Sequence, residues 1–170
     1  MQITKAMELV ASSKLRKAKL RAEDARPFFD AQYSLMCRIA GETENLSTVY
    51  TRHREVKNRL FIVIAGDRGL AGGYNSNVAK LITGQEEWKA EDVVVYAIGN
   101  KGREILERKG YTVKESCPEV IEEPTYAEAM LLSDKLLTSF AAGEIGEIYL
   151  AYTHFKNTVS HEPKLLKLLP

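Results

Sequence analysis

The chain has 170 residues and a formal net charge of +1 at pH 7, and this length suits one ordinary domain with an appendage. The near-neutral charge is not typical of a dedicated nucleic-acid binder. Cys37 and Cys117 lie too far apart to form a CxxC motif, so they predict neither a disulfide framework nor a zinc site. No apolar run approaches the roughly 20 residues of a membrane span, so we expect any membrane association to be indirect, through partners.

The first forty residues predict one long α-helix, since they contain no glycine and a single proline, Pro27. Apolar and small residues recur with a mean spacing of 3.67, which is the period of one continuous helical stripe: Met7, Ala11, Leu15, Ala18, Ala22, Ala25, Phe29, Tyr33, Met36 and Ala40. The stripe keeps its phase across Pro27, so we expect a kink rather than a break. At about 60 Å the helix is longer than this domain needs, and part of the stripe should pack on another long helix.

Six basic residues lie in the middle of this helix: Lys14, Arg16, Lys17, Lys19, Arg21 and Arg26. Only Glu23 and Asp24 oppose them. One interpretation is a solvated helix face. The other is a basic rod that meets acidic surfaces, either nucleic acid or acidic protein loops. Aromatic side chains for base stacking are sparse in this stretch, so nucleic acid is the weaker candidate.

After residue 58 the pattern changes to apolar runs that alternate with helical segments. The predicted strands are 59–66, 92–98, 111–115 and 147–155, with 159–169 as an edge strand. The predicted helices run from a glycine-rich loop at 67–77 to about Lys89, over 100–109, and from Thr125 to about Ala142. Glu128 lies three residues after Thr125, which predicts a capping box.

This alternation predicts the α/β class, with a three-layer α/β/α Rossmann-like domain and a long projecting N-terminal helix. Gly41 is the predicted stop of that helix, and a short helical stretch is expected at Leu46–Tyr50. A charged connector follows at 51–58. We therefore divide the chain into a helix with its connector, residues 1–57, and an α/β domain, residues 58–170.

Ligands of doubly wound sheets bind beyond the carboxyl ends of the strands. The polar residues predicted at that edge are Asp67, Arg68, Asn100, Lys101 and His154. The loop from Gly66 to Gly73 is the most suggestive segment, because glycines let backbone amides approach a phosphate at a helix N-terminus. However, neither GxxxxGK[ST] nor GxGxxG fits it, so a structural turn is favoured over an anion site.

The other chemical groups form no catalytic constellation. No histidine has neighbours at metal-ligand spacing, and neither HExxH nor a nucleophile elbow is present. Cys117, beside Pro118, is interpreted as a loop cysteine. The adjacent carboxylates Glu122 and Glu123 point apart in an extended loop and make a poor acid/base pair. The residues alone predict no active site, no cofactor and no metal.

Four segments resemble one family. They are ITKAMELVASSKLRKAK at 3–19, ARPFF at 25–29, GDRGLAGGYNSNV at 66–78 and EPKLLKLLP at 162–170. Together they are similar to the gamma subunit of the proton-translocating rotary ATP synthase. The resemblance implies a non-catalytic central-stalk subunit that couples proton flow to ATP synthesis or hydrolysis by rotation. It also implies a coiled coil inside a hexamer of alpha and beta subunits, and an α/β domain against the epsilon subunit and the c-subunit ring.

The resemblance further implies where this chain would meet its partners. The suspected contact residues are Lys5, Met7, Lys14, Arg16, Lys17, Asp67 and Arg68. The implied location is peripheral, at the cytoplasmic face of a bacterial plasma membrane, because the cysteine insertion of chloroplast members is missing. The family pattern also has more of the first helix before Met1 and a second long helix after Pro170. The alternative hypothesis is a small α/β nucleotide- or phosphate-binding protein that uses residues 67–77.

The exposed stripe leads to a first testable prediction. A contiguous apolar surface of several hundred Å² rarely stays in water. We therefore expect this 170-residue chain, expressed alone, to associate through its first helix with a second copy of itself, or else to fold that helix back on its domain. Sedimentation measures the first outcome directly. A strict monomer whose first helix is ordered, straight and solvated along its whole length would contradict the prediction.

Overall fold

The computed structural model describes residues 2–42, 47–52, 55, 58–117, 124–157 and 160–170. The chain forms two compact units, residues 1–46 and residues 47–170. The predicted division at 57/58 falls in the connector between the first helix and the first strand. Tyr50 in this connector stacks on Phe140 with ring centroids 6.3 Å apart, so this part of the connector packs with the α/β unit.

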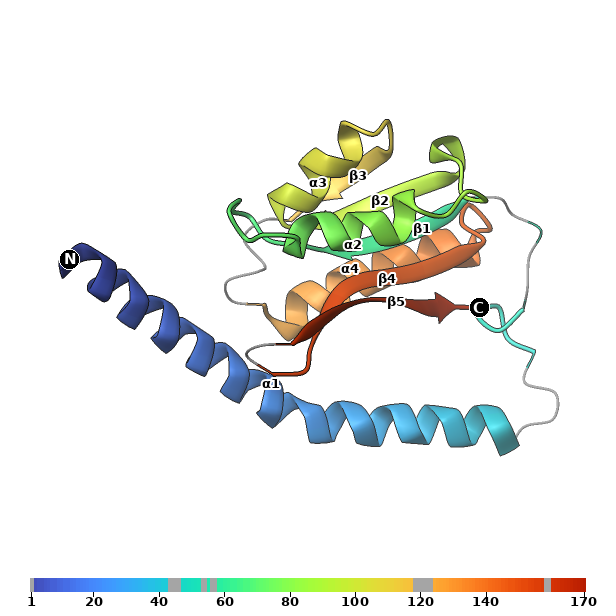
Figure 1. Ribbon diagram of the computed structural model, residues 1–170. Helices are drawn as coiled ribbons and strands as arrows, with labels where there is room; N and C mark the ends of the chain where they lie inside the picture. Colours follow the sequence, from blue (N-terminus) through green and yellow to red (C-terminus); the bar gives the residue numbers. More distant parts are fainter. Residues whose placement is uncertain (1, 43–46, 53–54, 56–57, 118–123, 158–159) are drawn as a thin grey trace. The chain divides into compact units, whose positions relative to one another are not determined.

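The first unit is a single helix, α1, which spans Gln2–Glu42 and includes Pro27 in its interior. Figure 1 shows that α1 changes direction near its middle, which fits the bond that Pro27 removes from the helical ladder. All described side chains from residue 4 to residue 42 are exposed. The stripe thus lies on the helix surface, where Phe29 and Tyr33 stack on each other at 5.9 Å. Among the described residues, no helix is both long and apolar enough to span a bilayer.

The prediction of a helical stretch at Leu46–Tyr50 is wrong for the residues of this stretch that the structure describes. Leu46 lies outside the described residues, and residues 47–50 form loop and turn. The Thr48 hydroxyl accepts hydrogen bonds from the backbone N–H groups of Tyr50 and Thr51, both at 3.2 Å. A threonine side chain that captures backbone donors competes with the helical ladder, which explains the turn.

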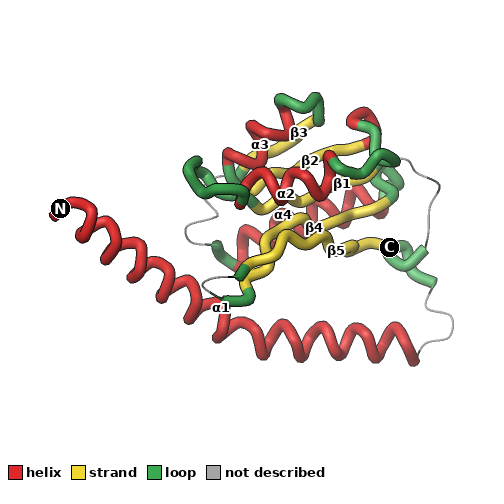
Figure 2. The backbone as a smooth tube through the Cα atoms, viewed as in Figure 1, coloured by secondary structure: helices red, strands yellow, loops and turns green. Residues whose placement is uncertain are grey.

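The second unit is built on one five-stranded sheet with the order β3-β2-β1-β4-β5. Its strands are β1 (Arg59–Ile64), β2 (Val93–Ile98), β3 (Thr112–Ser116), β4 (Glu147–Phe155) and β5 (His161–Leu169). The first four strands are parallel, and β5 pairs antiparallel with β4 at the edge of the sheet. The predicted edge strand is therefore confirmed, and Figure 2 shows β5 at the edge of the sheet beside β4. β4 has the predicted bounds.

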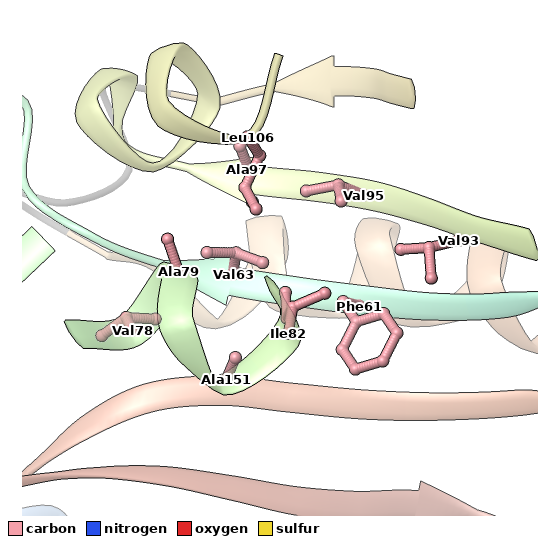
Figure 3. Packing of buried hydrophobic residues seen from close by; sticks show 10 residues of the cluster. All are labelled: Phe61, Val63, Val78, Ala79, Ile82, Val93, Val95, Ala97, Leu106 and Ala151. Atoms are coloured by element: carbon pink, nitrogen blue, oxygen red, sulfur yellow. The ribbon is translucent and has the colours of Figure 1, made fainter. Parts of the chain in front are cut away.

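Helices cover both faces of this sheet, which confirms the three-layer α/β/α architecture. They are α2 (Tyr74–Thr83), α3 (Asn100–Glu107) and α4 (Tyr126–Ala141), with a short 3-10 turn, η1, at Ala90–Asp92. α2 and α3 pack on the face that carries Phe61 and Val63 (Figure 3). α4 places Leu136 and Phe140 against the opposite face. β1 thus lies in the centre of the sheet with both of its faces buried.

Two helix ends show how far local sequence decides the fold. The capping box of α4 is confirmed, since Glu128 N–H donates to the Thr125 hydroxyl and the Glu128 carboxylate accepts from Thr125 N–H. α2, however, ends at Thr83 rather than near Lys89. Gly84 is the C-cap of α2, and a side chain at this position would lie only 2.8 Å from the Lys80 carbonyl oxygen. The chain then turns and Trp88 packs on the Phe61 ring, at 5.0 Å.

An ion-pair network joins three strands at the end of the sheet where β1 and β4 begin. The Glu147 carboxylate at the start of β4 accepts hydrogen bonds from Arg59 Nε of β1 at 2.7 Å and from Lys167 Nζ of β5 at 2.8 Å. The Glu147 side chain is only 13% exposed. Burial by itself raises the pKa of Glu147, but the hydrogen bonds and charges of Lys167 and Arg59 outweigh it and hold the pKa below its ordinary value.

This ion pair predicts a pH dependence of stability. A carboxylate with a lowered folded-state pKa stabilises the fold fully above its unfolded pKa, and the contribution is lost as the pH falls through the folded pKa. Glu147→Gln should therefore be less stable than the unchanged chain near pH 7, and its urea midpoint should fall less steeply between about pH 5 and about pH 3. Glu144→Gln, at an exposed position on the preceding turn, is the control. Equal slopes for Glu147→Gln and the unchanged chain would contradict the prediction.

Candidate functional site

The loop after β1 lies where a doubly wound sheet ordinarily binds its ligands. β1 is followed through α2 by β2 on one side and is paired with β4 on the other, so the strand order reverses at β1 and β4. The carboxyl ends of these strands open onto the segment Gly66–Gly73. This position matches the edge at which the sequence predicts a site, and the geometry of the loop decides between a structural turn and an anion cradle.

Side chains of the same unit fix the base of the loop. Asn75 at the start of α2 is buried, at 8% exposure, and its Oδ1 accepts a hydrogen bond from Gly66 N–H at 2.7 Å. Its Nδ2 donates to the Arg68 carbonyl at 3.2 Å. The Asp67 carboxylate accepts from Asn100 N–H at 2.9 Å, and Lys101 N–H donates to the Gly66 carbonyl at 3.0 Å.

These bonds occupy two backbone amides at the carboxyl edge of the sheet. The first N–H of α3 already faces a negative charge, because the Asp67 carboxylate occupies the place of an anion at that helix N-terminus. The Gly66 amide is likewise taken by Asn75. The geometry is therefore that of a structural turn between strand and helix, as the missing lysine and hydroxyl of the phosphate cradle predict.

The tip of the loop is open. Leu70 has a positive φ of 61° and its side chain is fully exposed, at 109%. Gly72 also has a positive φ, of 56°, a conformation that glycine adopts without strain. Arg68 is exposed beside them. The loop thus combines a fixed base with a solvent-facing tip.

The surface next to the loop is only slightly hollowed. One depression of about 250 Å³ is lined by Ala71, Gly72, Gly73, Tyr74, Asn77, Thr153, His161 and Pro163. This volume lies below the usual range for small-molecule sites. His154, on β4, lies opposite Glu162 of β5 and contacts the Tyr152 ring edge-on at 6.5 Å. Among the described residues no group of three acidic, histidine or cysteine side chains is placed to hold a metal.

The structure brings some of the predicted residues together and separates others. Asp67 meets the N-terminus of α3, which starts at Asn100. The Lys101 ammonium instead pairs with Glu104 at 2.6 Å. Arg68 belongs to the exposed tip. The remaining suspected contacts lie in the first unit, on α1, where all are exposed: Lys5, Met7, Lys14, Arg16 and Lys17.

On α1 the cations surround the apolar stripe rather than forming one basic face. At 3.6 residues per turn, Lys14 flanks the stripe on one side, Lys19 and Arg26 flank it on the other, and Arg16 lies opposite. Lys19 pairs with Glu23 one turn later, at 3.6 Å. A binder of a nucleic-acid groove concentrates its cations on one face. The arrangement on α1 instead presents positive charge in several directions.

The sequence reasoning missed two residues, one at the tip of the loop and one in the helix that follows it. Asn75 is the brace of the turn, and Leu70 is its strained tip. A polar residue in the first turn of a helix after a glycine-rich loop signals a side chain that can bond back to that loop, so Asn75 could have been found. The backbone conformation of Leu70 has no such signal, because leucine is not a residue that typically marks a positive φ.

The architecture is shared with solved central stalks of rotary ATP synthases. The structure is similar to a chain in the central stalk and c-ring of the mitochondrial ATP synthase of Tetrahymena thermophila, with a TM-score of 0.71 and 26% identity, covering 99% of this chain and 72% of that one. A chain of the Euglena gracilis mitochondrial ATP synthase rotor shares the fold, with a TM-score of 0.53 and 12% identity over 91% of this chain and 59% of that one. The fold is thus the one found in chains of solved ATP synthase central stalks and rotors.

Sequence comparisons identify the family. The family described as ATP synthase matches residues 1–170. The ATP synthase gamma chain of Lachnoclostridium phytofermentans is 50% identical over 99% of this chain, and the sodium ion specific gamma chain of Acetobacterium woodii is 40% identical over 100%. The chain belongs to the family of ATP synthase gamma chains. It spans 58% and 56% of the length of these two relatives.

The brace of the loop gives a testable prediction. Asn75→Ala should lower the free energy of unfolding by about 1–3 kcal/mol, because the Gly66 N–H and the Arg68 carbonyl lose their partner in a partly buried place. Asn77→Ala, an exposed position on the same helix, should change it by less than about 0.5 kcal/mol. Urea unfolding of both variants measures the difference. Equal stabilities for the two variants would show that Asn75 does not brace the loop.

Proposed function

We propose that this chain is the rotor part of an ATP synthase. As the central-stalk subunit, it couples ion flow through the membrane sector to ATP synthesis or hydrolysis in the catalytic hexamer, by rotation. The observation that supports this proposal most strongly is α1. A 41-residue helix whose apolar stripe is exposed along its length needs a partner outside its own domain. The match of the chain along its full length to ATP synthase gamma chains supplies the context.

The proposed mechanism rests on the asymmetry of the shaft. α1 pairs its stripe with another long helix, and the resulting rod turns inside a ring of alpha and beta subunits. A different side of the rod then faces each catalytic site in turn. Contacts that differ between orientations stabilise different nucleotide-binding states, which is the only way that a non-reacting partner can bias a site.

The proposed contacts on the shaft are Lys5, Met7, Lys14, Arg16 and Lys17. Positive charge that surrounds the helix can meet acidic loops at every angle of rotation, and such contacts remain partly hydrated and individually weak. Weak contacts suit a rotating helix, because it must break its contacts with one subunit before it meets the next. Met7 adds an exposed apolar surface, at 67%, within the same segment.

The proposed contacts of the α/β unit are Asp67 and Arg68 on the loop after β1. Arg68 is exposed at the tip. The Asp67 carboxylate already caps α3, so its contribution is to hold the loop for the neighbouring subunit. We assign the beta subunits to the shaft, and the epsilon subunit and the c-subunit ring to the α/β domain.

The chemistry of ATP belongs to other subunits in this proposal. We propose that the chain itself performs no catalysis and needs no cofactor, which is consistent with a glycine loop whose first amide, at Gly66, is bonded to Asn75 and whose Asp67 carboxylate is bonded to the start of α3. We propose protons as the coupling ion and the cytoplasmic face of a bacterial plasma membrane as the location. The chain would be peripheral there, attached through its complex.

The shaft contacts can be tested in the complete subunit within its complex. Lys14, Arg16 and Lys17 changed together to glutamine should alter ATP hydrolysis and its coupling several-fold, because three weak ion pairs act in concert. Thermal melting of the α/β domain should hardly change, since these residues lie in the other compact unit. Activity of the reassembled complex and melting curves of the subunit are the two measurements.

The control is a substitution that should unfold the α/β domain, which the glutamine variant should not do. Ile62→Asp places an unpaired charge in the central strand, where Ile62 is 9% exposed, and should unfold the domain. If the glutamine variant melts much lower than the unchanged subunit, the basic residues serve the fold. If hydrolysis and coupling are indifferent to it, these residues are only a solvated surface and the proposed contacts are wrong.

A further inference from the structure

Leu70 occupies a conformation and an environment that the fold does not explain. Its φ of 61° places it in the left-handed region, which costs energy for any residue with a branched or bulky side chain. Its side chain is fully exposed, so no packing within the described structure offsets this cost. A glycine or an asparagine would adopt the same turn with less strain. A leucine therefore serves something other than the stability of the turn.

The residues around Leu70 leave its side chain accessible from several directions. Gly69, Ala71, Gly72 and Gly73 surround it in sequence, and none of them carries more than a methyl group. At Gly69 and Gly72 an added side chain would have nothing within 4 Å, which confirms that the space around the tip is open. A partner surface can thus approach the leucine closely.

The base of the loop holds this tip in place. Asn75 bonds to Gly66 and to Arg68, and the Asp67 carboxylate bonds to the start of α3. The base on which the tip stands is therefore preformed, and a partner would not have to order that base on binding. Preformed elements bind more tightly because less conformational entropy is lost. Strain kept in a rigid turn is a feature of binding sites.

We propose that Leu70 is an apolar anchor that inserts into an apolar pocket of a neighbouring protein subunit, with the Arg68 guanidinium pairing with an acidic group at the rim of that pocket. This inference rests on the proposed function, and it adds a contact residue and the chemistry of its partner. A single leucine is too small to hold a membrane surface, which takes a broad apolar helix face or a lipid chain. It suits a protein pocket that one side chain fills.

A pair of variants of the full-length subunit tests the proposal. Leu70→Asn removes the apolar anchor but accepts the left-handed conformation, whereas Leu70→Met keeps both the apolar character and the strain. The Asn variant should bind several-fold more weakly to the rest of the complex while its melting temperature stays the same or rises by up to about 4 °C. The Met variant should bind and melt like the unchanged subunit.

The outcomes separate this inference from the proposed function. If the unchanged subunit does not bind the rest of the complex, the proposed function fails. If the unchanged subunit binds and the Asn variant binds equally well, only the role of Leu70 is wrong. A lower melting temperature for the Asn variant would show that Leu70 stabilises the fold, and this result would also overturn the inference.

Discussion

The constraint on which the α/β unit depends is the burial of β1 on both faces. Phe61 and Val63 face α2 and α3, while Leu60 and Ile62 face α4, so all four side chains need helices on opposite sides of one sheet. Such a strand must sit in the centre, and its connections must leave from the carboxyl edge. Because β1 is the central strand, the glycine loop that follows it lies in the middle of the carboxyl edge of the sheet. The same burial holds the loop base rigid, since Asn75 extends from the helix that packs on β1.

At the edge of the sheet where doubly wound folds bind small ligands, the chain's own side chains bond to two backbone amides. The Asp67 carboxylate takes the place that a phosphate would occupy, and the Asn75 amide takes the loop donor at Gly66. What remains open is the tip, which carries a cation and a strained leucine. The α/β unit thus carries a loop with a fixed base and a small exposed tip. α1 carries an exposed apolar stripe and basic residues. We propose that both features serve contacts with other proteins.

Much of this could be predicted because it depends on local chemistry. The phase of the stripe predicted that α1 continues through Pro27, and the Thr125–Glu128 pair predicted the start of α4. Features that depend on tertiary contacts could not be predicted in the same way. α2 ends at Thr83, Gly84 forms its C-cap, and the chain then turns so that Trp88 packs on Phe61. The bonds of Asn75 join segments that the sequence alone does not place together. The strain at Leu70 has no local cause, which is why we interpret it as functional.

The central claim is that this subunit turns while the catalytic sites work. It is tested most directly by fixing the catalytic hexamer to a surface, attaching a bead to the α/β domain of the complete subunit, and watching the bead while ATP is hydrolysed. The account predicts rotation of the bead in one direction, at a rate that follows the rate of hydrolysis. A bead that stays still, on complexes that hydrolyse ATP at the full rate, would contradict it.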